Sequence, residues 1–229
     1  MRKLSLVALL GIFLLASSIC AQDVPGIKFG IKGGVNLANV AGDDAGESDM
    51  LLGFAGGVFV QVPMGPLTFQ PEAHFTMKGA KSSSTMDIMG TLYDTEEKIK
   101  LTYIEVPMLF KYKLQTAGNM APCFFVGPAV ALNMGAKYEI SINDESADVD
   151  IYNKKDIDFG IVFGAGVDFA MGTKTLSLDA RYTMGLTAAL DDVDSPDDIP
   201  DDEVAFVDDD GKGLDIKNTN IQVMVGISF

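Results

Sequence analysis

Long stretches of this chain alternate between apolar and polar side chains with a period of two residues, and this limits the possible folds more than any other feature. The sharpest case runs from Leu67 to Lys78, where Leu, Phe, Pro, Ala, Phe and Met alternate with Thr, Gln, Glu, His, Thr and Lys. Successive side chains of a β-strand point to opposite faces, whereas a helix would mix the two sets. The pattern therefore predicts strands with one apolar and one polar face.

Eight segments carry this alternation: 27–37, 52–62, 67–78, 103–113, 123–133, 157–169, 176–186 and 220–229. Their length of about 9 to 14 residues suits a tilted strand that crosses a bilayer, while strands of soluble proteins average about five or six. The connections alternate between short turns (63–66, 115–122, 172–175) and long acidic stretches (41–50, 80–98, 136–156, 188–215). The expected fold class is all-β, a transmembrane antiparallel up-and-down β-barrel of eight strands with short periplasmic turns and long acidic extracellular loops.

A soluble barrel of eight strands is the main alternative, and it would turn the apolar faces inward. The long strands, the glycine-rich polar face and the aromatic C-terminal residue favour the membrane. Three prolines within the segments, Pro71, Pro107 and Pro128, cannot donate to a strand ladder. We expect them at bulges or at weakly paired positions.

The first residues predict export. Arg2 and Lys3 precede an apolar run that ends in small residues, which is typical of a signal peptide at 1–21 followed by a barrel domain at 22–229. Lipidation at Cys20 is the alternative, although Ile19 is bulky for lipoprotein processing. Without the signal peptide, 15 basic groups remain against 32 acidic ones. Because of this acidic excess, we expect no nucleic-acid partner. The signal peptide and the barrel pattern together predict that the protein is located in the bacterial outer membrane, in contact with its lipids.

Four segments resemble the PorT-like family of small outer-membrane β-barrels, whose architecture is similar to the OmpA and OmpX barrels. They are FGIKGGVNLANV at 29–40, YIEVPMLFKYKL at 103–114, FVGPAVALN at 125–133 and FGIVFGAGVDF at 159–169, and YIEVP is the most specific. The terminal ISF, ending in Phe229, resembles the signal by which the barrel-assembly machinery recognises its substrates. The resemblance implies fold and location, but it does not imply an activity.

The polar faces carry nearly balanced charge, six basic and five acidic side chains. Charges confined in a barrel of eight strands must pair or stay hydrated. We expect Glu72, Glu105, Lys111 and Arg181 to form a central ion-pair network that plugs the lumen, with a small conducting pore as the alternative. His74 could neighbour Glu72, but no nucleophile or substrate cleft is recognisable, so the chain is not expected to be an enzyme and needs no cofactor.

The stretch from Asp191 to Asp215 holds 12 acidic residues and one lysine. Its simplest interpretation is a solvated, self-repelling loop. The alternative is calcium binding, with Asp208, Asp210 and Asp215 as candidate ligands around a glycine turn, although the spacing lacks the terminal glutamate of a full calcium loop.

The sequence favours a non-enzymatic outer-membrane barrel with an envelope-structural or surface-interaction role. A component of, or accessory to, a protein-secretion apparatus is the second hypothesis, which the PorT-like resemblance allows. An outer-membrane enzyme that acts on lipids is the third. The partners expected are outer-membrane lipids, the assembly machinery during biogenesis, and a surface or secretion protein.

Overall fold

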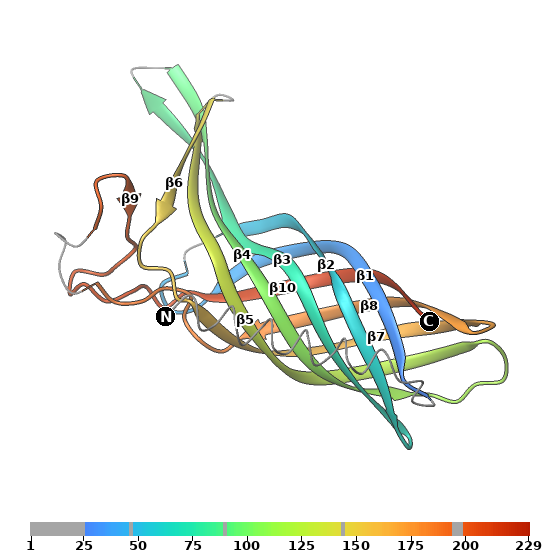
Figure 1. Ribbon diagram of the computed structural model, residues 1–229. Coiled ribbons are helices and arrows are strands. Elements are labelled where there is room, and N and C mark those ends of the chain that lie inside the picture. Colours follow the sequence, from blue (N-terminus) through green and yellow to red (C-terminus); the bar gives the residue numbers. More distant parts are fainter. Residues whose placement is uncertain (1–25, 46–47, 89–90, 143–144, 194–198) are drawn as a thin grey trace.

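The computed structural model describes residues 26–45, 48–88, 91–142, 145–193 and 199–229. The predicted signal peptide at 1–21 lies outside these residues. The described chain forms ten strands (Figure 1): β1 Lys28–Ala41, β2 Asp49–Met64, β3 Leu67–Ile88, β4 Thr91–Lys113, β5 Met120–Ile142, β6 Glu145–Ile151, β7 Ile157–Met171, β8 Lys174–Gly185, β9 Glu203–Val204 and β10 Lys217–Ser228. Within the described residues, no helix is long and apolar enough to cross a membrane.

Eight of these strands close into a ring. Their order is β1-β2-β3-β4-β5-β7-β8-β10, all neighbours are antiparallel, and β10 pairs with β1 to complete the circle. The seam extends from Gly30 opposite Ser228 to Ala41 opposite Lys217. Closure gives every one of these strands a partner on both sides, which a sheet in a bilayer requires because its backbone groups find no water there. The structure confirms the predicted fold class.

The two faces of the ring follow the predicted alternation. On β1 the Ile31 side chain is 56% exposed on the outside, whereas Lys32 next to it is 5% exposed and points into the lumen. The same holds on β2, where Phe54 is 65% exposed. The apolar rows cover the outside and the polar rows fill the centre, so the soluble-barrel alternative is excluded.

The turns lie at one end of the ring, which we call the turn end, and the long connections lie at the other, the loop end (Figure 1). Gly65 and Gly172 occupy the two tightest turns with φ of 65° and 64°, a region that favours glycine. The β3–β4 ladder pairs Pro71 with Met108 and resumes at His74 opposite Glu105. Pro71 therefore lies at the edge of this unpaired interval and Pro107 lies within it, as expected for residues without a backbone donor.

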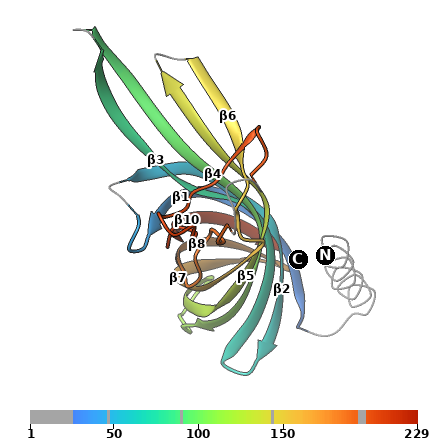
Figure 2. The ribbon, with the colours of Figure 1, turned by 90° about the vertical axis from the view of Figure 1, so that its left-hand side faces the viewer.

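Two of the stretches predicted as loops are largely strand. The β3–β4 hairpin continues to Ile88 opposite Thr91, β5 follows β4 to Ile142, and β6 adds a further strand. We call this four-stranded extension, residues 81–88, 91–100, 136–142 and 145–150, the wing; it projects beyond the ring at the loop end (Figure 2). Apart from the part that packs against the loops at its base, both faces of the wing are largely exposed, so its sequence lacks the apolar alternation that identifies the barrel strands.

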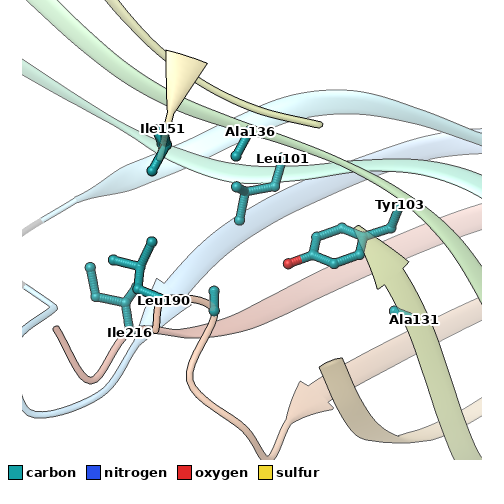
Figure 3. Packing of buried hydrophobic residues seen from close by; sticks show 8 residues of the cluster. Leu101, Tyr103, Ala131, Ala136, Ile151, Leu190 and Ile216 are labelled. Carbon is teal, nitrogen blue, oxygen red and sulfur yellow. The ribbon is translucent and has the colours of Figure 1, made fainter. Parts of the chain in front are cut away.

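An apolar cluster lies where the ring opens into the wing (Figure 3). It joins β4, β5 and β6 to the loops around β9, through Leu101, Tyr103, Ala131, Ala136, Ile151, Ala189, Leu190 and Ile216. We call this cluster the stopper. The acidic loop is therefore anchored at both ends by apolar side chains, in contrast to the freely solvated loop that its charge predicts.

Candidate functional site

The centre of the lumen holds a compact group of charged side chains. Glu72 of β3 lies at its middle and is 3% exposed. Its carboxylate accepts hydrogen bonds from Lys32 Nζ at 2.7 Å and Arg181 Nη1 at 2.7 Å. Asp179 also binds both cations, at 2.9 Å from Lys32 and 3.2 Å from Arg181. Two buried cations thus share two buried carboxylates, which satisfies the requirement that buried charges be paired.

Further polar side chains complete this group. Gln70 Nε2 donates to Glu72 at 2.5 Å, and Gln61 Nε2 donates to Gln70 at 2.8 Å. His74 Nε2 lies 2.9 Å from the other Glu72 oxygen, and the imidazole is 1% exposed. The pair that suggested acid–base chemistry is therefore sealed within the charged cluster, away from bulk solvent.

Separate pairs lie toward the two ends of the barrel. On the loop side, Lys78 Nζ lies 2.5 Å from Glu105. On the turn side, Lys111 and Lys113 each bind Asp168 at 2.8 Å. Of the four residues predicted to form one network, the structure brings Glu72 and Arg181 into direct contact.

Glu105 and Lys111, by contrast, are placed in other pairs. The partners that the sequence did not single out are Lys32, Lys78, Lys113, Asp168 and Asp179. The sequence could have indicated them as partners only through their positions on the polar faces of the predicted strands.

Two phenylalanines fill lumen space that glycines leave open. A Cβ added at Gly30 would meet the Phe59 ring at 2.3 Å, and one at Gly164 would meet Phe125 at 2.6 Å. The same rings lie beside the central cations, with Lys32 Nζ 4.9 Å from the Phe59 centroid. Glycine on one strand thus lets an aromatic ring from another strand pack against the buried cations.

The acidic loop is held by one buried amide. Asn153 Nδ2 donates to the carbonyls of Asp191 and Phe206, both at 2.9 Å, and Phe206 N donates to Asn153 Oδ1 at 3.1 Å. This side chain ties the loop after β6 to the start of the acidic stretch and to Phe206 within it. The sequence analysis did not identify it, because a lone asparagine in a polar connection carries no periodic signal.

The candidate calcium ligands do not converge. Asp208 Oδ1 accepts from the backbone of Asp210 and Lys212, both at 2.9 Å, and so closes a local turn. Asp215 instead binds Lys217 at 2.7 Å. In the described part of the chain, no three acidic, histidine or cysteine side chains gather as a metal site would require.

A charged ladder covers the face of the wing that continues the outer wall of the barrel. Lys98 binds Glu96 at 2.5 Å and Glu139 at 3.4 Å, and Lys100 binds Glu139 at 2.6 Å. The hydrogen bond from Lys98 lowers the pKa of Glu96, and that from Lys100 lowers the pKa of Glu139. The pair of Lys98 with Glu96 lies within β4. Glu139 on β5 binds Lys98 and Lys100 across the strands, and these cross-strand pairs stabilise a sheet that has no apolar core of its own.

Phe229 follows directly on the last strand. Its backbone N donates to the Phe29 carbonyl at 2.8 Å, and its ring is 55% exposed with Lys174 Nζ 5.2 Å from the centroid. The aromatic ring at this seam is therefore accessible from outside the barrel at the turn end.

Two solved structures are similar to this chain in fold. Neisserial surface protein A is 13% identical, with 90% of this chain and 100% of that chain covered and a TM-score of 0.44. Ail, the attachment invasion locus protein of Yersinia pestis, solved with the heparin analogue sucrose octasulfate, is 13% identical, with 89% and 99% covered and a TM-score of 0.40. No curated protein matches the sequence.

A family comparison covers most of the chain. Residues 20–191 match the family described as outer membrane protein beta-barrel domain. The matched span contains β1 to β8 in full, so it includes seven of the eight strands of the ring. The closed ring of eight strands, the apolar outer face and this match lead to one conclusion: the chain belongs to the outer membrane protein beta-barrel domain family.

Proposed function

We propose that this chain is a non-enzymatic outer-membrane barrel that does not conduct, and that its loop end contacts a partner outside the cell. The packed interior carries the proposal. Paired side chains fill the lumen around Glu72, Glu105 and Lys111, and the stopper covers the loop end. A barrel of eight strands is just wide enough for its own side chains. With the interior occupied, the wing and the loops are the parts available for interaction.

The orientation and the route of assembly belong to the same proposal. In outer-membrane barrels the short turns face the periplasm and the longer loops face outward. The wing and the acidic loop would then stand above the outer leaflet. Residues 1–21 would direct export, and Phe229, exposed beside the seam, would present the assembly signal. The barrel itself would serve as the envelope anchor for the exposed parts.

Conductance measures the first part of the proposal. Purified chain inserted into a planar lipid bilayer is expected to give no current steps in concentrated potassium chloride. A porin reconstituted in the same way serves as the positive control for insertion and detection. Regular, repeatable current steps from the purified chain would show an open lumen and refute the plugged barrel.

Site-specific cross-linking in intact cells measures the second part. A photo-reactive amino acid at Thr85, exposed on the wing, is expected to capture a discrete partner. The matched control is Thr116, exposed in a connection at the turn end. Equal capture from both positions, or none from the wing, would count against a surface-interaction role for the loop end.

A secretion accessory of the PorT-like type is the second candidate. It rests on the resemblance of YIEVP at 103–107 and its neighbouring segments to that family. Co-purification of the chain in detergent would separate the two candidates, because a secretion accessory should retain secretion subunits that face the periplasm. Cross-links from Thr116 would then exceed those from Thr85.

An enzyme that acts on lipids has the least support. His74 is its one candidate acid–base group, and the imidazole is enclosed by the central ion pairs. Replacing His74 with Ala is expected to leave the lipid composition of the outer membrane unchanged. An altered lipid profile in that variant, with the barrel still folded, would revive the enzyme hypothesis.

A further inference from the structure

A pocket of about 270 Å³ opens beside the stopper, between the wing and the acidic loop. Its apolar wall is built by side chains from β1, β4, β5 and the end of the acidic loop: Val40, Ile99, Tyr138, Phe206, Leu214 and Ile216. The first five of these are half-buried and pack against the stopper with one side. Apolar surface therefore stays uncovered in a part of the molecule that faces water, which is a feature of interaction sites.

The size of the pocket limits what it can hold. Sites for drug-sized ligands usually measure about 300–1,000 Å³. A volume below that range suits one large side chain of a partner protein, which is how anchor residues are seated at protein interfaces. The pocket is already formed before a partner binds. Three of its six apolar side chains lie on strands, and Asn153 holds Phe206 through two hydrogen bonds.

The rim of the pocket is acidic. Asp44 and Glu97 lie on it together with Lys81. Lys81 is already paired with Glu96, at 3.5 Å. Among the described residues, no lysine or arginine nitrogen lies within 4.0 Å of the Asp44 or Glu97 carboxylate. Burial, together with the nearby Glu97 carboxylate, raises the pKa of the Tyr138 hydroxyl to about 12, so this hydroxyl stays protonated.

Charge beyond the rim has the same sign. The acidic stretch that ends at Asp215 borders the pocket through Phe206 and Leu214, and acidic groups far outnumber lysines in it. A field of one sign at a cleft favours partners of the opposite sign and speeds their association. An occupant with basic groups around an apolar anchor matches both the wall and the rim.

We propose that this pocket receives a large apolar side chain of a partner protein, flanked in that partner by lysine or arginine. The inference rests on the proposed surface-interaction role and specifies the chemistry of the partner. The apolar wall holds the anchor, and Asp44 and Glu97 bind the flanking cations. Affinity comes mainly from the anchor, because exposed ion pairs contribute little.

The probe is the blocked peptide Lys-Lys-Phe-Lys-Lys, titrated calorimetrically into the full chain in detergent micelles. Control peptides replace Phe by Gly, or every Lys by Glu. The pocket should bind the probe at least tenfold more tightly than either control. Equal binding of the Gly peptide would reduce the effect to general attraction between charges and overturn the proposal, as would no binding of the probe at millimolar concentration.

Two pairs of variants locate the binding. Ser82 is exposed on the pocket side of β3, and Ser83 points to the opposite face of the wing, so Ser82→Phe should block the pocket and Ser83→Phe should not. We expect at least tenfold weaker binding in the first and less than a twofold change in the second. Heat-dependent mobility on gels verifies that both variants are folded.

The second pair of variants tests the charge of the rim. Glu97→Gln changes the rim itself, and Glu145→Gln, at the tip of β6, is its matched control. Both remove one negative charge, but only the first should weaken binding, by about three- to fivefold as expected for a rim charge. Unchanged binding in Ser82→Phe would overturn the proposal. Such a result leaves the conductance and cross-linking outcomes untouched, so failure of the pocket is distinguishable from failure of the proposed function.

Discussion

Replacing Glu72 with Gln should destabilise the barrel more than any other single charge removal in the lumen. In the wild type the cations Lys32 and Arg181 are matched by Glu72 and Asp179. The amide keeps the volume of the side chain, so no cavity forms. It removes one negative charge, however, and leaves two buried cations facing a single carboxylate.

The expected cost follows from this imbalance. Removing one partner of a buried ion pair typically costs about 3–5 kcal/mol, because the remaining charge stays buried without compensation. Glu72 contacts both cations at 2.7 Å and is almost fully buried, so we expect a value within that range. With a slope of about 4 kcal/mol per molar guanidinium, the unfolding midpoint should fall by about 1 M.

The chain contains no tryptophan, so the fraction of folded barrel is best followed by its mobility on gels without heating. Refolding into lipid vesicles over a guanidinium series gives the free energy. Adding Arg181→Gln to Glu72→Gln restores neutrality, and we expect the double variant to lose about 1–3 kcal/mol less than the sum of the single losses. A Glu72→Gln variant within about 0.5 kcal/mol of wild type, or strictly additive losses, would refute the account of the lumen.

Three further perturbations test other parts of the structure. Asn153→Ala removes three hydrogen bonds and should speed trypsin cleavage of the acidic loop several-fold, with the barrel midpoint unchanged. Gly164→Ala drives a methyl group into Phe125 and should cost about 1–3 kcal/mol in the same gel assay; a neutral result would contradict the packing. The lowered pKa values of Glu96 and Glu139 mean that their ion pairs stabilise the wing fully above about pH 4.5 and lose effect as the pH falls through the folded-state pKa. Pepsin should therefore cut the wing faster at pH 2.5 than at pH 4, and equal rates would exclude this role.

The barrel was predictable because its signal is local. Each strand of the ring must present one face to hydrocarbon and one to a crowded interior, and this constraint appears in every second residue of segments such as 67–78. The short turns around Gly65 and Gly172 were marked by glycine and proline. Fold class, strand faces and the position of the turns could therefore be read without knowing which strands pair.

Pairing between distant residues could not be predicted in the same way. The contact between Glu72 and Arg181 depends on how the ring closes, and many combinations of lumen charges satisfy neutrality. The wing escaped prediction because its strands are held by cross-strand charges such as Lys98 and Glu139. The anchoring of the acidic loop rests on a few apolar residues, among them Phe206, whose significance appears once the stopper is known.

The seam between β1 and β10 has a consequence for biogenesis. One edge of β1 has no partner until β10 is available, so the ring cannot be completed strand by strand during translation. During that wait, long rows of apolar side chains have no lipid around them. The chain is therefore most prone to aggregate before insertion, and closure of the ring is a single late event that waits for β10, the last of its strands.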